Sequence, residues 1–133
     1  MPVADTEILF ALNPRDPKHP QVLRLLKPRT DVTAPDVAML EFQLVLRARG
    51  RRPAQVKMAM LALHEALVRY RVREVQTLNS SSLALQCELE EKHGLSYFDS
   101  LVAAAALALD RKVISSDEAF DGVPGLERVR LES

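Results

Sequence analysis

The chain has 133 residues, of which 47% are apolar and only four are glycine, and its 18 basic residues balance 18 acidic ones. This length predicts a single domain, residues 1–133, large enough to bury a hydrophobic core without disulfide or metal cross-links. The neutral net charge argues against a protein that coats nucleic acid by charge alone, but it leaves room for an enzyme with one local basic patch.

The compartment is predicted from three features of the sequence. The single cysteine, Cys87, excludes an internal disulfide, and its place in a helical pattern predicts a buried free thiol. We expect no export signal, because no basic segment followed by an apolar run opens the chain. The most apolar stretch, residues 101–109, is too short to span a bilayer. A cytoplasmic protein without a membrane partner is therefore expected.

Short β-type runs alternate with longer helical patterns along the chain. In the first half of the chain we predict a strand over residues 2–4, helices over 6–12 and 17–27, a strand over 30–33, a helix over 35–50 and a helix from Pro53. In the second half we predict a strand over 73–78, a helix capped by Asn79 or Ser80 and ending at Gly94, and a helix over 96–109. A strand over 112–115, a helical turn from Asp117 and a strand over 128–131 complete the prediction. This alternation indicates an α/β fold, with a central parallel sheet of four to five short strands and helices on both faces.

Two aspartates directly follow predicted strands. Asp5 follows the first strand, and Asp117 follows the strand over residues 112–115. In parallel sheets, ligands bind beyond the carboxyl ends of the strands, near the point where the strand order reverses. Each aspartate also stands where a helix N-cap is expected, so a capping role remains an equal alternative on the sequence alone.

Two further carboxylates fall on apolar helix faces. Glu41 shares a face with Val37, and Asp99 shares one with Val102 and Ala106. A carboxylate turned toward a core needs a cation or must take up a proton. Arginine is one candidate partner, but most arginines cluster at helix ends. A shared Mg²⁺ or Mn²⁺ accounts for several inward carboxylates at once, because these hard cations prefer oxygen ligands.

Each of these carboxylates lies in a characteristic segment of sequence. The segments are VADTEILFAL at residues 3–12, AMLEF at 38–42, YFDSLVAAA at 97–105 and VISSDEAF at 113–120. In order, spacing and strand or helix context, they resemble the four acidic motifs of PIN domains, and the likeness covers essentially the whole chain. Within that family the compact form is most similar to VapC-type toxins of type II toxin–antitoxin pairs.

The resemblance implies a ribonuclease that cleaves RNA with Mg²⁺ or Mn²⁺. Its catalytic and metal-binding residues would be Asp5, Glu41, Asp99 and Asp117, with Asp5 and Asp99 as direct ligands and the others binding directly or through metal-bound water. Supporting roles are expected for Thr6, Ser115 and Asp121, although Asp121 also fits an ordinary turn. The family further implies a homodimer and inhibition by a small antitoxin protein that inserts into the active-site groove.

Glu7 departs from the family pattern, because PIN domains usually carry a small or amide residue two positions after the first aspartate. Its carboxylate either adds negative charge near the metal or points outward. The first strand is also unusually short. Two alternatives stay open: a PIN-type module that binds RNA or protein without cutting, and a housekeeping RNA-processing nuclease without an antitoxin. A signalling receiver domain is disfavoured, because the third strand offers no aspartate.

Five basic residues lie at the end of the helix that carries Glu41 and just beyond it: Arg47, Arg49, Arg51, Arg52 and Lys57. They fit either ordinary charged helix ends or a surface that holds RNA phosphates near the site. His64 lies between Met60 and Leu67 on an apolar face, which predicts a partly buried structural histidine. No paired nucleophile and base indicates Ser–His or Cys–His catalysis.

Overall fold

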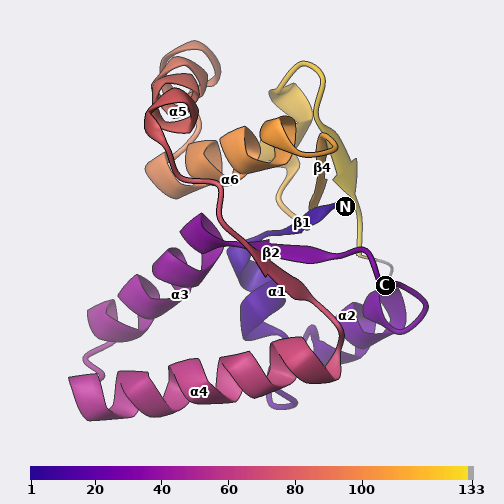
Figure 1. The fold of residues 1–133 in the computed structure, drawn as a ribbon, viewed down its shortest axis with the longest axis vertical. Helices are drawn as coiled ribbons and strands as arrows, with labels where there is room; N and C mark the ends of the chain where they lie inside the picture. Colours follow the sequence, from indigo (N-terminus) through magenta and orange to yellow (C-terminus); the bar gives the residue numbers. More distant parts are fainter. Residues whose placement is uncertain (132–133) are drawn as a thin grey trace.

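A computed structural model describes residues 1–131, so residues 132–133 of the predicted domain lie outside the described part. Residues 1–131 form one parallel sheet of five short strands in the order β3-β2-β1-β4-β5 (Figure 1). The strands are β1 (Val3–Ala4), β2 (Thr33–Pro35), β3 (Arg73–Val75), β4 (Lys112–Ile114) and β5 (Glu127–Val129). The strand order reverses at β1, which has β2 on one side and β4 on the other.

Helices cover both faces of this sheet, as predicted. They are α1 (Thr6–Phe10), α2 (His19–Leu26), α3 (Asp36–Ala48), α4 (Pro53–Arg69), α5 (Ser80–His93), α6 (Tyr97–Ala108) and the 3₁₀ helix η1 (Glu118–Gly122). Figure 1 shows α5 and α6 on one side of the sheet and α1 to α4 on the other. The α/β fold with a parallel sheet flanked on both faces is confirmed.

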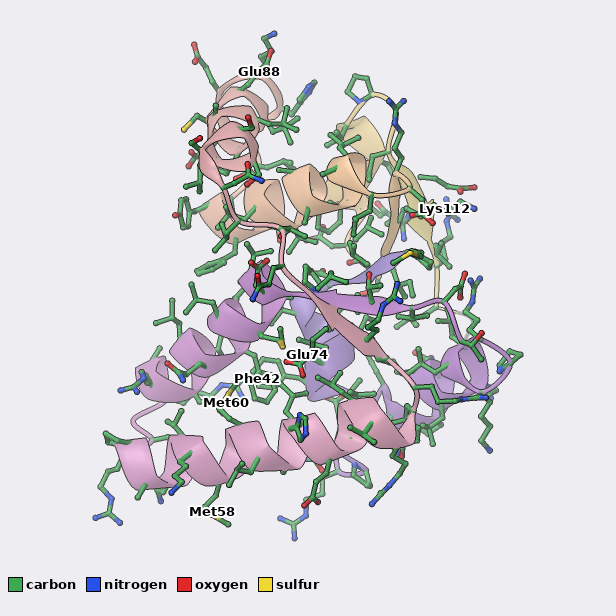
Figure 2. The ribbon with its side chains drawn as sticks, viewed as in Figure 1. Phe42, Met58, Met60, Glu74, Glu88 and Lys112 are labelled. Atoms are coloured by element: carbon green, nitrogen blue, oxygen red, sulfur yellow. The ribbon has the colours of Figure 1, made fainter. Side chains whose placement is uncertain are left out.

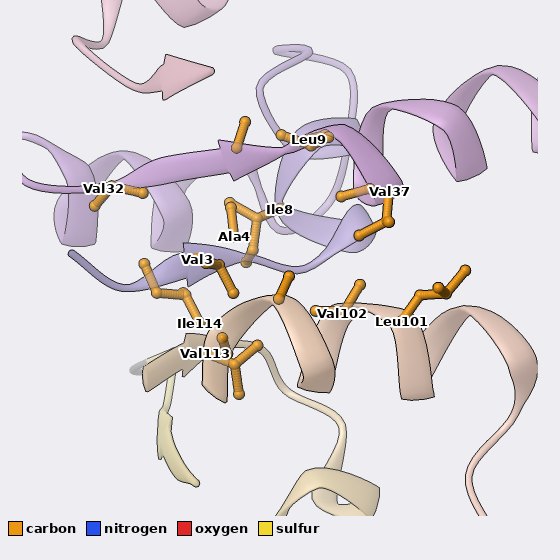
Figure 3. Packing of buried hydrophobic residues seen from close by; sticks show 14 of the residues in the cluster. Val3, Ala4, Ile8, Leu9, Val32, Val37, Leu101, Val102, Val113 and Ile114 are labelled. Atoms are coloured by element: carbon orange, nitrogen blue, oxygen red, sulfur yellow. The ribbon is translucent and has the colours of Figure 1, made fainter. Parts of the chain in front are cut away.

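The core is built where α6 lies against the two central strands. Val102 and Ala106 of α6 are fully buried, as are Val3, Val113 and Ile114 of the strands. Figure 3 shows the labelled valines of α6 and the strands converging in this layer. The alanines of α6 allow its backbone to approach the sheet closely, because they add little side-chain volume. This close approach holds the N-terminus of α6 at the carboxyl edge of the sheet.

All five strands differ from their predicted boundaries, three of them by two or more residues at one end. The prediction over 30–33 was wrong, because β2 forms over Thr33–Pro35, where Thr33 pairs with Val3 of the central strand. The third strand stops at Val75, short of the predicted residue 78, because the Asp36 carboxylate takes the backbone N–H groups of Thr77 and Leu78. The last strand is β5, Glu127–Val129, which begins one residue earlier and ends two residues earlier than predicted.

Two burial predictions were wrong. Cys87 is exposed, because α5 packs mainly on α6 and turns Gln86 and Leu89, not Cys87, toward it. His64 is exposed as well and lies 3.6 Å from the Glu74 carboxylate. The buried face of α4 is centred on Leu63, one residue away, so His64 points to solvent. Figure 2 shows the same helix directing Met60 inward and Met58 outward.

Across residues 1–131, none of the helices combines the length and the apolar character needed to cross a membrane.

Candidate active site

The structure places the four predicted carboxylates at the carboxyl edge of the sheet. Asp5 directly follows β1 and Asp117 lies just beyond β4, its parallel neighbour. Glu41 is in the second turn of α3, and Asp99 is in the first turn of α6. This edge, at the point where the strand order reverses, is where α/β sheets bind their ligands.

Asp5 is the most buried carboxylate of the group, with 6% of its surface exposed. One oxygen caps α1 by accepting the Thr6 N–H at 2.8 Å, and the other accepts the Ser115 hydroxyl at 2.8 Å. Burial raises the pKa of Asp5 to about 7 against these two hydrogen bonds, and the charges of Asp99 and Glu7 raise it further. Asp5 is therefore a helix cap and also a carboxylate held in a negatively charged pocket.

Asp99 lies at the centre of the group. Its pKa is raised by partial burial and by the nearby carboxylates of Asp117 and Glu7, against the hydrogen bond with Ser96. The charge of Asp99 acts in turn on Asp5 and on Glu41, whose pKa is raised first by burial and then by Asp99. Asp5, Glu41 and Asp117 therefore each lie near enough to Asp99 for their charges to interact, and Asp99 is the carboxylate that the three have in common.

The supporting residues hold individual carboxylates in place. The Thr6 hydroxyl donates to Glu41, and Ser115 links the two strand ends, because its hydroxyl donates to Asp5 and accepts the Asp117 N–H at 3.0 Å. Asp117 itself is exposed and caps η1 through the Ala119 N–H at 2.9 Å. Asp5 and Asp117 therefore cap α1 and η1, as the sequence allowed, and both also belong to the carboxylate cluster.

Asp121 is connected to the cluster through Arg128. It forms a two-pronged ion pair with Arg128, with nitrogen–oxygen distances of 2.8 and 2.9 Å. The Arg128 side chain is 6% exposed and also donates to the Ser115 carbonyl at 3.3 Å. Asp121 thus acts on the site through Arg128. Sequence reasoning missed Arg128, because nothing in the sequence of β5 indicates that its arginine turns toward β4.

Glu7 is turned into the site and does not point outward. It accepts hydrogen bonds from Ser116 and from the Lys18 ammonium, which lies 3.0 Å from Glu7 Oε2. Burial alone would raise the pKa of Glu7, but the bonds from Ser116 and Lys18 outweigh it and hold the pKa below its ordinary value. Sequence reasoning identified Glu7 and missed Lys18, which lies at the start of the helix predicted over residues 17–27, where a lysine looks like an ordinary exposed residue.

The basic residues Arg47, Arg49, Arg51, Arg52 and Lys57 are exposed around the corner between α3 and α4. Arg49 lies eight residues beyond Glu41, about 12 Å farther along the helix axis. Its guanidinium covers the Phe10 ring at 5.2 Å from the centroid. The structure does not bring this group to the carboxylates, so any contact with RNA would be at a distance from the cluster.

The donor chemistry of the cluster fits a hard divalent cation. Its side chains offer only oxygen, and three of the four predicted ligands have raised pKa values that a bound cation would lower. Within residues 1–131, however, no three Asp, Glu, His or Cys side chains are close enough to hold a metal ion as they stand. Binding would therefore have to draw the carboxylates closer, which their mutual repulsion opposes in the metal-free protein.

Comparison with protein families matches residues 3–126 to the PIN domain. The chain belongs to the PIN domain family, whose members are usually nucleases. No curated protein matches the sequence.

Solved structures of toxin–antitoxin proteins share the fold. VapBC2 from Rickettsia felis, bound to a DNA fragment from its promoter, is 18% identical with a TM-score of 0.70 and 98% of each chain covered. VapC20 of Mycobacterium tuberculosis, a sarcin–ricin loop cleaving toxin, is 18% identical with a TM-score of 0.69, over 95% of this chain and 98% of that one. FitAcB from Neisseria gonorrhoeae is 17% identical with a TM-score of 0.67, over 96% of each chain.

Proposed function

We propose that the chain is a metal-dependent endoribonuclease that hydrolyses RNA phosphodiester bonds at the site formed by Asp5, Glu41, Asp99 and Asp117. The observation that supports the proposal is the charge interaction of Asp99 with each of the other three carboxylates, at the point where the strand order of a PIN-domain sheet reverses. When bound, Mg²⁺ or Mn²⁺ supplies charge stabilisation at the scissile phosphate and a water of lowered pKa. Asp5 and Asp99 are the proposed direct ligands.

The other residues of the site have defined tasks in this proposal. Ser115 fixes the rotamer of Asp5, and Thr6 fixes Glu41, because each hydroxyl donates to the carboxylate beside it. Ligands held by such hydrogen bonds lose less freedom when an ion binds, which favours binding. Asp117 closes the cluster from the loop after β4, and Asp121 supports that loop through Arg128.

Asp99→Asn tests the proposal directly. The neutral amide removes a charge from the centre of the cluster, and we expect RNA cleavage with Mn²⁺ to fall by about 1,000-fold, because the charge stabilisation contributed by a metal ion is worth several kcal/mol. The measurement is initial cleavage rate on a labelled RNA. Glu88→Gln, which removes an exposed carboxylate from α5, is the matched control and is expected to cleave like the wild type. Identical traces for wild type and Asp99→Asn would rule out the nuclease proposal.

We also propose that the enzyme is the toxin of a type II toxin–antitoxin pair. The related structures include a toxin–antitoxin complex from Klebsiella pneumoniae, 16% identical with a TM-score of 0.67. In this proposal a small antitoxin docks in an apolar pocket of about 460 Å³ between α1, α3 and α4, which none of the four carboxylates lines, and not in the active-site groove that the family resemblance implied. A homodimer is proposed as well, supported by the exposed Leu40 and Leu44 on one face of α3.

Inspection of the neighbouring genes tests the toxin proposal. A short upstream gene for a DNA-binding protein would support the toxin, and the absence of such a gene would favour a housekeeping nuclease.

One observation favours a second candidate, a PIN-type module that binds RNA or a partner protein without cutting. Within the described residues the carboxylates do not form a ready three-ligand metal site, and Glu7 adds a further negative charge. The comparison of wild type with Asp99→Asn separates the two functions, because a binding module would retain RNA affinity in both proteins and cleave with neither.

A further inference from the structure

Glu7 connects three segments that are far apart in the sequence. Its Oε2 atom lies 3.0 Å from the Lys18 ammonium and 2.8 Å from the Ser116 hydroxyl, and that hydroxyl lies 3.0 Å from the same ammonium. The three polar groups therefore form a closed triangle. The other oxygen, Oε1, accepts the Ser116 N–H and lies 3.4 Å from the Ser115 hydroxyl. Every contact is between α1, the turn just before α2 and the loop after β4.

Lys18 is held in place by its own loop. The Asp16 carboxylate accepts the Lys18 N–H at 2.8 Å, and His19, the first residue of α2, contacts the Ala11 carbonyl through its ring at 2.7 Å. Pro17 and Pro20 flank this turn and restrict its backbone. The ammonium is thus presented to Glu7 by an ordered turn, and less side-chain entropy is lost on forming the triangle than for a free surface lysine.

The loop bound by Glu7 carries two groups of the proposed active site. Ser115 donates to Asp5, and Asp117 belongs to the carboxylate cluster, so Ser116 lies between a supporting residue and a proposed ligand. We propose that Glu7 and Lys18 act as a clamp that fixes the loop of residues 115–117 against α1 and so positions Asp117. In this role, which rests on the proposed nuclease function, Glu7 and Lys18 are positioning residues.

The hydrogen bonds distinguish a clamp from a fifth metal ligand. Both Glu7 oxygens already accept hydrogen bonds from nitrogen or hydroxyl donors, and the Lys18 ammonium balances the negative charge. A ligand role would require Glu7 to give up the Ser116 N–H and the ion pair together. Glu7, which departs from the family pattern, is therefore neutralised by Lys18 of the same chain. Its presence is compatible with a metal site at the neighbouring carboxylates.

Amide hydrogen exchange with and without Glu7 tests the clamp independently of catalysis. In Glu7→Leu, which keeps the size of the side chain but removes both acceptors, we expect the Ser116 N–H to exchange at least about tenfold faster, with helix amides unchanged. Glu7→Gln keeps an acceptor for that N–H and should restore most of the protection. Glu88→Leu, which breaks the exposed pair with Lys92, is the matched control and should leave Ser116 unaffected.

Kinetics give a second readout of the clamp. With Mn²⁺ and RNA, Glu7→Leu should lower kcat by about 10- to 100-fold, with KM little changed, because Asp117 is misplaced.

The outcomes separate the clamp from the nuclease proposal. Faster Ser116 exchange in Glu7→Leu, with rescue in Glu7→Gln, supports the clamp even if neither protein cleaves RNA, in which case only the nuclease proposal fails. Unchanged Ser116 exchange in Glu7→Leu overturns the clamp, whatever the activity. A Glu7→Leu variant that cleaves faster than wild type also overturns it, because Glu7 would then be an inhibitory charge. A selective drop of kcat in Lys18→Met, smaller than in Glu7→Leu, supports the ion pair as part of the clamp.

Discussion

Asp5→Asn is expected to lower Mn²⁺-dependent RNA cleavage by about 1,000-fold or more and at the same time to stabilise the metal-free protein. The amide keeps the shape of the carboxylate, the cap on the Thr6 N–H and a polar partner for Ser115. It removes a buried charge that repels Asp99 and Glu7. A pKa raised from 3.8 to about 7 corresponds to a charge penalty of about 4 kcal/mol, an upper bound for the gain in stability at pH 8.5.

Both effects are measured on one pair of proteins. Urea unfolding in EDTA at pH 8.5 gives the stability difference, and cleavage of a labelled RNA with Mn²⁺ gives the activity. Loss of activity together with loss of stability would mean that Asp5 is mainly a structural cap. Full activity in Asp5→Asn would remove it from the proposed ligands.

The metal-free protein is expected to lose stability as the pH rises from 5.5 to 8.5. The pKa of Asp5 is raised in the folded state, so folding is favoured while Asp5 is protonated, and this contribution is lost as the pH passes through about 7. Between these two pH values the loss from Asp5 is about 2 kcal/mol, and the raised pKa values of Asp99 and Glu41 act in the same direction. Below this range the lowered pKa values of Glu7 and Asp36 act in the opposite direction.

Unfolding in urea at both pH values, with EDTA or with Mn²⁺, measures this effect. We expect Mn²⁺ to stabilise the protein more at pH 8.5 than at pH 5.5, because ion binding competes with protons for the carboxylates. Asp5→Asn should show a clearly smaller pH dependence in EDTA. A metal-free wild type that is equally stable at both pH values would contradict a buried, repulsive carboxylate cluster.

Local rules of helix formation predicted much of the architecture. Asn79 and Ser96 cap α5 and α6, Gly94 ends α5 with a positive φ of 64°, and Pro53 begins α4, as the sequence indicated. These features depend on contacts within a few residues, so they can be read from a short window of sequence. The position of β2 could not be read in this way, because its register depends on pairing with Val3 some 30 residues earlier.

Sequence reasoning singled out the four carboxylates and missed the cations beside them. The four carboxylates stand out because polar groups at strand ends and on apolar helix faces break the pattern of a core. Lys18 and Arg128 follow no such pattern, since a lysine at the start of a predicted helix and an arginine in an edge strand look like ordinary surface residues. Only the fold brings Lys18 to Glu7 and Arg128 to Ser115. Burial of Cys87 was mispredicted for a related reason, because helical spacing does not show which face of α5 meets α6.

Anomalous diffraction from a crystal soaked in Mn²⁺ tests most directly whether the four carboxylates form a metal site. We expect a Mn²⁺ peak between Asp5 and Asp99, with oxygen distances of about 2.1–2.2 Å and with Glu41 and Asp117 drawn inward, directly or through water. Glu7 should remain bound to Lys18 and Ser116 and should not coordinate the ion. A saturated crystal with no peak at the carboxyl edge of β1 and β4, or with Mn²⁺ bound only elsewhere, would contradict a metal-dependent nuclease at this site.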